Sequence, residues 1–424
     1  MADMARAQQL DREDPLSRWR DEFHLPAGRI YLDGNSLGPA GRRAEAKVQD
    51  VLAAWRDHGI DGWLSGNAPW LTLADDAARA AAPLVGAETA SVAVTGQTTS
   101  NLHQLLATLY DPAHSTRRVI VGDALNFASD THALRSHLRL RGLDPEQALR
   151  TVPSRDGRLL WIDDILNALT EDVQLLVLPS VVFTSGQLLD VTTITRKARE
   201  RGVMVLWDLS HSIGAVPHAL DRDGVDGAFW CHYKWLNAGP GAVGGLYLNR
   251  RHFDREPGLA GWWGVRPERR FAMAPVHERA AGAAGLHVGT PHILSLAPLL
   301  GSLEVIAAAG GVGVLREKSL ALTSFLLEAA DARLAPLGFK VVTPRSAHAR
   351  GGHVALAHPE GWRICQALKA EGVVPDFRAP DIIRLAPSPL FTRFTECLEA
   401  VECLRRIVSA GAHLGFPGQQ AKVT

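Results

Sequence analysis

The chain lacks a surplus of charge of either sign. Its 424 residues carry 45 Lys and Arg against 45 Asp and Glu, so its formal net charge is zero. A basic surplus would indicate a nucleic-acid partner, and an acidic tail would indicate a solvating arm. The sequence offers neither, and we expect no nucleic-acid partner.

Cysteine is scarce and long apolar runs are missing. The four cysteines show no CxxC pairing and no metal-ligand spacing, which is typical of reduced thiols in a cytoplasmic protein. No run of about 18 apolar residues occurs, so we expect no membrane span. Residues 1–14 are polar and lack the apolar core of a signal peptide, so we expect a frayed arm there.

Metal-ligand motifs are also missing, although the chain has 17 histidines. No HExxH motif occurs, and neither His211 with His218 nor His287 with His292 comes with a convincing third ligand. We therefore expect no metal site.

What the chain does contain is a long alternation of strand-like and helix-like segments. Apolar, strand-like runs lie at 91–94, 118–121, 173–178, 203–208, 227–230 and 244–248. Helical patterns lie between and around them, for example at 42–58, 101–110 and 192–201. This alternation predicts an α/β fold with a mostly parallel sheet covered by helices on both faces.

The length and the later segments predict two domains. A chain of 424 residues is too long for one small core. Beyond residue 310, strands and helices mix in a way that indicates a separate α+β lobe. We expect residues 56–295 to form a large domain and 296–424 a small C-terminal domain, to which residues 1–55 contribute an arm and a helix.

One lysine and one aspartate are the most informative residues. Lys234 stands in an aromatic segment that turns glycine-rich, 229–241, and Asp208 ends the apolar run 203–207. Ligand sites of α/β sheets gather at such C-terminal strand ends. Taken singly, a lysine among aromatic residues is usually a surface side chain, and a strand-end Asp is often a helix cap. Together they match what the cofactor pyridoxal phosphate needs, a lysine for its Schiff base and a carboxylate for its ring nitrogen.

The surroundings of both residues fit that interpretation. Desolvation among the aromatic side chains should lower the pKa of Lys234 and free its amine as a nucleophile. Upstream, a strand meets Gly96 and the hydroxyls of Thr98 and Thr99 just before a helix, where backbone N–H groups can hold an anion. On its own this would be an ordinary hydroxyl cap. We therefore expect a pyridoxal-phosphate enzyme.

Six segments are more specific. They are LDGNSLG at 32–38, FASD at 127–130, WDLSH at 207–211, YKWLNAGPG at 233–241, GWWG at 261–264 and IRLAPSPL at 383–390. In this order they resemble the kynureninase family, within fold type I of the pyridoxal-phosphate enzymes, and the resemblance spans nearly the whole chain. It implies a seven-stranded type of sheet in the large domain, pyridoxal 5'-phosphate as cofactor, and a homodimer with shared active sites.

The resemblance implies roles around the cofactor. Lys234 would form the Schiff base and later move protons at Cα, while Asp208 would pair with the pyridinium nitrogen. Phe127 would stack on the ring, and Asp130 would lie near it. The residues around the phosphate would be Thr98, Thr99, His211 and Tyr233.

Further cofactor contacts are implied, one of them with a departure from the family's pattern. Family members often have Ser or Thr at the end of one strand, where this chain has Pro179 followed by Ser180. Proline has no hydroxyl, so we expect this phosphate contact to be lost or to shift to Ser180. Trp262 and Thr290 resemble a pair that reaches over from a second subunit, so the enzyme would need a homodimer to be complete.

The resemblance also implies the reaction, hydrolysis of L-kynurenine between Cβ and Cγ to anthranilate and L-alanine in tryptophan degradation. Arg384 would hold the α-carboxylate, because a guanidinium fork matches two carboxylate oxygens. Trp63 and Ser36 align with positions near the substrate's aromatic ring, and Tyr233 would act as acid and base. With Trp63 and Thr290 in place, we expect kynurenine to be preferred over its 3-hydroxy form.

Two other interpretations stay open. A different fold type I enzyme, such as a cysteine desulfurase or an aminotransferase, would share the Asp and the Lys. A desulfurase needs a cysteine in a mobile loop, however, and the thiols beyond Lys234 lie in helical patterns. A non-catalytic homologue that binds or regulates would have no use for the full set of Asp208, Tyr233, Lys234 and Arg384.

Overall fold

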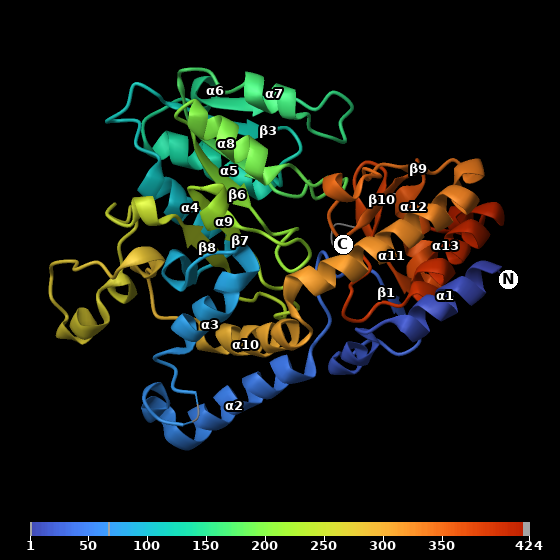
Figure 1. Ribbon diagram of the computed structural model, residues 1–424, viewed down its shortest axis with the longest axis horizontal. Coiled ribbons are helices and arrows are strands. Elements are labelled where there is room, and N and C mark those ends of the chain that lie inside the picture. The colour runs from blue at the N-terminus through green and yellow to red at the C-terminus, as the bar shows by residue number, and fades with distance from the viewer. Residues whose placement is uncertain (1, 67, 419–424) are drawn as a thin grey trace.

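The computed structural model describes residues 2–66 and 68–418, and its centre is a seven-stranded sheet (Figure 1). The strands, in sheet order, are β2 (Val92–Val94), β8 (Gly245–Leu248), β7 (Gly227–Trp230), β6 (Met204–Asp208), β5 (Val173–Pro179), β3 (Val119–Asp123) and β4 (Leu149–Val152). β7, β6, β5, β3 and β4 run parallel, whereas β8 pairs antiparallel with both β7 and β2. The expected mostly parallel sheet is confirmed.

Helices cover both faces of this sheet. On one face, α4 (Thr98–Leu109) and α5 (Ala128–Leu140) share a core with Leu206 of β6. On the other face, α3 (Leu73–Ala81), α8 (Val191–Glu200) and α10 (Ile293–Ala308) share a core with Trp207. Leu206 and Trp207 are adjacent and fully buried, because successive side chains of a strand point to opposite faces. Burial on both sides explains why these strands read as continuous apolar runs.

A smaller antiparallel sheet forms a second core, at the right of Figure 1. Its strands, in order, are β12 (Asp376–Arg378), β13 (Ile382–Leu385), β10 (Val354–Ala357) and β9 (Lys340–Val341). The helices of this core are α11 (Gly311–Leu334), α12 (Gly361–Ala370) and α13 (Phe394–Ser409). The expected smaller α+β lobe is therefore present.

The N-terminal segment is a helix, not the frayed arm that its polar composition predicts. α1 (Ala2–Glu13) packs on α13, and its Ala7 is fully buried in the smaller core. The carboxylate of Asp11 accepts hydrogen bonds from the N–H groups of Phe394 at 2.6 Å and Thr395 at 3.2 Å, at the start of α13. A polar helix of 12 residues is marginal alone, so tertiary contacts stabilise it, and these leave little trace in the sequence.

Two further segments from the first 60 residues lie against later parts of the chain. β1 (Ile30–Tyr31) pairs parallel with β11 (Val373–Val374), beside the smaller sheet. α2 (Arg42–His58) packs along α10, as the lower part of Figure 1 shows. The start of the chain thus contributes to both cores.

The loop 32–41 connects the smaller sheet with the segment that carries Lys234. Asp33 forms a parallel bridge with Ala386, just after β13. A few residues later, the N–H of Gly38 donates to the carbonyl of Tyr233 at 2.8 Å. One short loop is therefore anchored to both bodies of the molecule.

α10 and α11 mark the passage from one core to the other. Leu296 and Leu315 belong to the larger core, whereas Leu322 and Leu326, further along α11, belong to the smaller one. Within the described residues no single helix is long and apolar enough to cross a membrane; α10 and α11 pass that test only jointly, across a bend of 75°. The division of the chain into the ranges given above stays a prediction.

Candidate active site

A cavity opens at the C-terminal ends of β5 and β6, where the sequence predicts a ligand site. Pro179 and Asp208 end these two strands and are register partners. The starts of α4 and α5 and the segment after β7 complete the wall. The lining residues are Thr98, Thr99, Phe127, Asp130, Pro179, Val181, Phe183, Asp208, Ser210, His211, Tyr233 and Lys234. Eight of the residues predicted from the sequence therefore lie in one cavity.

Lys234 reaches the cavity from the segment that follows β7. Its Nζ lies 2.8 Å from Nε2 of His211, which comes shortly after β6. Asn237, three residues further on, has a φ of 54°, a left-handed conformation that Asn tolerates better than most residues. A Cβ on Gly38 would collide with the Asn237 side chain, so the loop 32–41 can approach this segment only because position 38 is glycine.

Three buried acids, Asp208, Asp130 and Asp123, act on one another at this edge of the sheet, and the charge of Lys234 acts on Asp208 and Asp130. Oδ1 of Asp208 accepts a hydrogen bond from the N–H of Ser210 at 2.8 Å, and the Oδ2 atoms of Asp130 and Asp123 are buried without a hydrogen-bond partner among the described residues. Burial raises the pKa of Asp208, and the Lys234 ammonium opposes this. Burial, followed by the charge of Asp208, raises the pKa of Asp130, and burial raises the pKa of Asp123 to about 7. The three acids together can carry more negative charge than the single Lys234 ammonium balances.

Helix N-termini form another polar part of the cavity. Thr98 and Thr99 are the first two residues of α4, and Oγ1 of Thr99 lies 2.6 Å from Oγ of Ser129 in the first turn of α5. N–H groups at a helix start carry partial positive charge and have no partner inside the helix. Together with the hydroxyls, they can bind a phosphate group.

Two rings, Phe127 and His211, face the same space. Phe127 is 49% exposed and meets Phe183 edge-on, with 5.6 Å between ring centroids. His211 is buried, and burial, followed by the charges of Lys234 and Arg384, lowers its pKa. Its imidazole is therefore neutral at neutral pH and can accept a hydrogen bond from the lysine amine.

Arg384 lies behind the cavity wall. Its side chain is fully buried, its Nη1 donates to the carbonyl of Phe183 at 2.7 Å, and its Nη2 donates to Oγ of Ser36 at 3.0 Å. The same Nη2 forms an ion pair with Asp376. Burial lowers the pKa of Arg384 to about 10. Ser36 is hydrogen-bonded to this arginine, and its expected place near the substrate's aromatic ring remains a prediction.

The hydroxyl of Ser180, expected to take over the phosphate contact that Pro179 lacks, has partners inside the protein. Its hydroxyl donates to the backbone carbonyl of Asp208 at 3.0 Å and lies 2.6 Å from Oγ of Ser212. Pro179 lines the cavity, whereas Ser180 is fully buried behind it. Both interactions of this hydroxyl lie within the protein interior, and the expected shift of the phosphate contact to Ser180 remains a prediction.

Trp63, Trp262 and Thr290 are not brought to the cavity by this chain. Trp63 packs against Trp70 and Trp263, with centroid distances of 5.8 and 5.6 Å. Trp262 and Thr290 are exposed, on the segment between β8 and α10. Their predicted roles remain predictions.

Several neighbours of the site were missed by sequence reasoning, namely Asp123, Phe183, Ser210, Asp376 and Arg378. Asp123 ends β3 and carries the same strand-end signal as Asp208, which could have revealed it. Asp376 stands on a three-residue strand, and only the pairing of β12 with β13 brings it beside Arg384. No pattern in the sequence predicts that register.

These groups fit pyridoxal phosphate. Asp123 and Asp130 each have a buried carboxyl oxygen without a partner among the described residues, and a protonated ring nitrogen beside Asp208 would add positive charge to this group of acids. The start of α4 offers N–H and hydroxyl donors to a phosphate. The amine of Lys234 lies in the same cavity for covalent attachment.

Solved structures of low sequence identity share the fold. A cystine C-S lyase, C-DES, in complex with its reaction product cysteine persulfide has a TM-score of 0.76 at 19% identity, covering 89% of this chain and 98% of that one. The apo cysteine desulfurase from Thermococcus onnurineus NA1 has a TM-score of 0.77 at 16% identity, covering 93% and 98%. The fold, with this cavity at its strand ends, is that of the fold type I pyridoxal-phosphate enzymes.

Sequence similarity identifies the family. Residues 315–404 match the model of the kynureninase C-terminal domain. The kynureninase of Geobacillus thermodenitrificans (strain NG80-2) is 46% identical over 417 residues, which cover 98% of this chain and 97% of the relative. The chain belongs to the kynureninase family. The kynureninase of Shouchella clausii (strain KSM-K16) is 45% identical over 414 residues, with 98% and 96% coverage.

Proposed function

We propose that this protein is a pyridoxal-phosphate-dependent kynureninase, which hydrolyses L-kynurenine between Cβ and Cγ to anthranilate and L-alanine in tryptophan degradation. The observation that supports it most is the Lys234 amine in one cavity with Asp208, in a chain 46% identical to a kynureninase over 98% of its length. When bound, the cofactor supplies an electron sink that makes the substrate's Cα proton acidic and allows the bond beyond Cβ to break.

Each side chain around the amine has its own proposed role in catalysis. Lys234 would hold the cofactor covalently and then move a proton at Cα of the substrate. His211, neutral and 2.8 Å away, orients that amine by hydrogen bonding. Asp208 would keep a proton on the ring nitrogen, because a buried carboxylate favours a neighbouring cation. Phe127 offers its exposed ring face to the cofactor ring.

Tyr233 is the proposed acid and base of the hydrolytic half of the reaction. Burial, followed by the neighbouring Cys231 and Asp208, raises the pKa of its phenol. The phenol therefore carries its proton at neutral pH and can donate it to Cβ as the carbon–carbon bond breaks. The hydrogen bond from Gly38 to its backbone carbonyl fixes the residue next to Lys234.

Incubation of the cofactor-loaded protein with L-kynurenine tests this function. Anthranilate fluorescence and an equimolar amount of L-alanine are expected. Lys234→Ala should abolish both the activity and the yellow absorption of the loaded protein. Borohydride reduction and peptide mapping should place the label on Lys234, and a label elsewhere would contradict the assignment.

The cysteines do not favour the desulfurase alternative. All four are free and buried, so none is exposed as the nucleophile that such an enzyme needs. Unpaired thiols of this kind are typical of reducing compartments and support a cytoplasmic location.

Trp63 supports a preference for L-kynurenine over 3-hydroxykynurenine. Its indole packs on two other tryptophans and offers mainly carbon surface. Beside the substrate's ring, where the family resemblance places Trp63, a hydroxyl added to that ring would lose water without gaining a hydrogen-bond partner. A higher kcat/KM for 3-hydroxykynurenine than for kynurenine would refute this preference.

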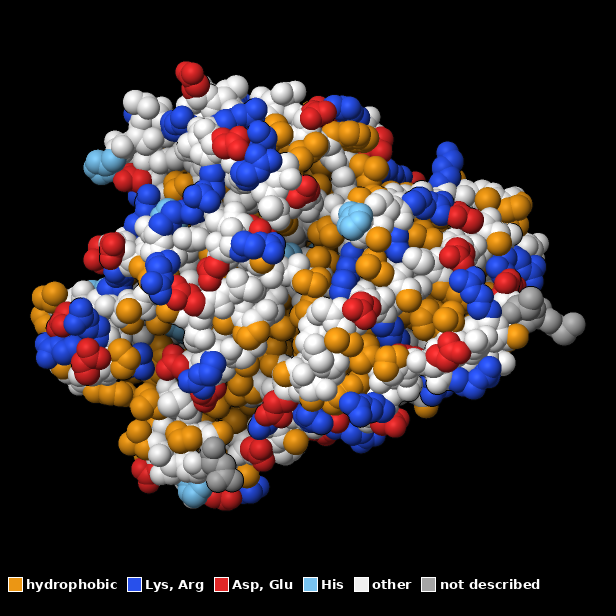
Figure 2. Space-filling model, in the orientation of Figure 1, with side chains coloured by type: hydrophobic (Ala, Val, Ile, Leu, Met, Phe, Trp, Pro, Cys, Tyr) orange, Lys and Arg blue, Asp and Glu red, His pale blue; other side chains and the backbone are white. Residues whose placement is uncertain are grey.

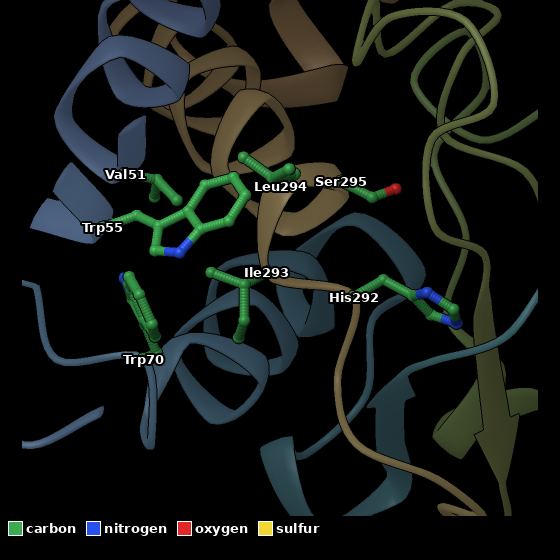
Figure 3. A pocket seen from close by; sticks show the side chains of 7 residues that line it. All are labelled: Val51, Trp55, Trp70, His292, Ile293, Leu294 and Ser295. Carbon is green, nitrogen blue, oxygen red and sulfur yellow. The ribbon is translucent and has the colours of Figure 1, made fainter. Parts of the chain in front are cut away.

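An apolar surface supports a homodimer with shared active sites. Among the described residues, fifteen large apolar side chains are exposed, and eleven of them lie within residues 52–64 and 259–294. Figure 2 shows this apolar surface over α2, α3 and α10, at the lower left. In its middle, Trp55, Trp70, Ile293 and Leu294 line an open groove (Figure 3). A patch of this kind is typical of an interface, and a second copy of the chain is its proposed occupant.

The second copy would also explain the placement of Trp262 and Thr290. Both are exposed within the segment 259–294, which supplies seven of those exposed apolar side chains, and neither lines the cavity of its own chain. Across a two-fold axis, such residues can complete the partner's site.

A further inference from the structure

Arg384 shares one aspartate with a second arginine. Nη2 of Arg384 and Nη2 of Arg378 both contact Oδ2 of Asp376, the latter at 3.0 Å. Ser36 donates its hydroxyl to the same oxygen at 2.9 Å and accepts from Arg384 at 3.0 Å. Asp376 and Arg384 are cross-strand partners of β12 and β13, so the sheet itself sets their contact.

The cluster has more hydrogen-bond donors than acceptors. Among the described residues, the Nε atoms of Arg384 and Arg378 are buried without a partner. A guanidinium carries five N–H donors, and a buried donor left unpaired is destabilising. The neighbouring acid Asp33 pairs with neither Nε, and its own Oδ1 is buried without a partner among the described residues; burial raises its pKa, and the charges of Arg384 and Arg378 oppose this. The two arginines together can therefore take one more carboxylate.

We propose that Asp376 is the resident partner of Arg384, that the substrate's α-carboxylate takes its place, and that Arg378 is the positioning residue that retains Asp376 during this exchange. The exchange depends on the carboxylate-binding role proposed above for Arg384. Only one edge of that guanidinium has to turn, because its Nη1 is held on the cavity wall by the carbonyl of Phe183 at 2.7 Å.

The second arginine makes the exchange favourable. With both guanidinium groups present, Asp376 and the substrate's carboxylate each have an opposite partner, and Asp33, whose pKa burial raises, is the remaining acid near the two arginines. Without Arg378, Asp376 would have Arg384 as its one cationic partner, and the substrate could bind only by leaving a buried carboxylate uncompensated. Arg378 thus acts on substrate affinity through Asp376.

A double-mutant cycle in the cofactor-loaded enzyme tests this role. Arg378→Gln should raise KM for L-kynurenine about 10-fold while kcat changes less than about threefold, because binding and not chemistry is impaired. Asp376→Asn alone should leave KM within about threefold of the parent value. In the double variant, KM for L-kynurenine should return most of the way to the parent value, because the competing carboxylate of Asp376 is gone.

Direct binding provides a second readout that needs no turnover. By isothermal titration calorimetry, Arg378→Gln should weaken binding of L-alanine about 10-fold and leave ethylamine, the same amine without its carboxylate, unchanged. Arg345→Gln, which removes an exposed ion pair with Asp331, is the matched control and should behave like the parent. If Arg378→Gln does not fold, Arg378→Lys keeps the charge and should give a smaller loss of L-alanine affinity.

Three results would overturn the proposal. They are a double variant as impaired as the sum of the single ones, equal losses for L-alanine and ethylamine, and a rise in KM for Asp376→Asn that matches Arg378→Gln. Failure of the proposed function gives a different outcome. In that case the loaded parent protein releases no anthranilate, while the comparison of L-alanine with ethylamine still reports on the exchange.

Discussion

At the residue scale, the buried carboxyl group of Asp123 makes the free energy of unfolding of the cofactor-free protein depend on pH. This carboxyl lies at the end of β3, has an unpartnered Oδ2 and has its pKa raised by burial to about 7. Between that value and the ordinary pKa of aspartate, the folded chain holds a proton that the unfolded chain has released. The associated stability is therefore present at low pH and is lost as pH rises toward 7.

Asp123→Asn should remove this dependence on pH in the cofactor-free protein. The neutral amide needs no proton, so the free energy of unfolding should rise by about 1–3 kcal/mol at pH 8, with a smaller gain at pH 5. Urea unfolding at both pH values measures the difference. A gain of equal size at pH 5 and pH 8 would show that the carboxyl does not titrate in the folded state.

At the same scale, the residues that sequence could find are those that follow apolar strands. Asp208 was predictable because a buried strand ends there, and the ends of parallel strands converge on one edge. The position of Ser180 was not, since its hydroxyl is turned by contacts with a residue 32 positions away. The pairing of Asp376 with Arg384 likewise depends on a strand register that no local pattern shows.

At the scale of elements, the strands and helices of the larger sheet were the most predictable. Four of the five parallel strands, β3, β5, β6 and β7, are buried on both faces and are apolar runs. The edge strand β4 is only partly buried, and no apolar run predicted it. α2 was found over 42–58 because its apolar side chains recur at helical spacing. α1 was missed, and so was the distribution of the first 60 residues over two cores, since contacts with distant segments decide both.

The contact between α1 and α13 gives a prediction at this scale. The Asp11 carboxylate accepts from the N–H groups of Phe394 and Thr395 and from the Thr395 hydroxyl. Asp11→Ala should lower the free energy of unfolding by about 1–2 kcal/mol, because two N–H groups at a helix start lose their acceptor. Thermal unfolding measures the loss, and Glu13→Ala on the same helix, with an exposed side chain, is the control. Equal Tm values for Asp11→Ala and the control would disprove this cap.

At the scale of the whole molecule, the apolar surface over α2 and α10 predicts the oligomeric state. Trp55 is 60% exposed at the edge of the groove in Figure 3. Trp55→Glu should convert a dimer into a monomer, because a charge cannot be buried there without a partner, and activity should fall with it. Light scattering coupled to gel filtration reports the mass. Leu140→Glu, at the end of α5, is the matched control and should stay dimeric.

A dimer that survives Trp55→Glu with full activity would place the interface elsewhere. Mixing inactive variants gives a sharper check. Lys234→Ala combined with a Trp262→Ala variant should regain part of the activity only if each site draws residues from both copies.

The double anchoring of the loop 32–41 limits how this molecule can move. A hinge motion that swings the smaller sheet, with Arg384 in it, must pull on Asp33, and within five residues the tension reaches the backbone of Tyr233. The smaller sheet and the segment that carries Lys234 therefore do not move independently of each other. A substrate whose carboxylate is bound by Arg384, the role proposed above, would therefore displace the backbone beside Lys234 through this loop.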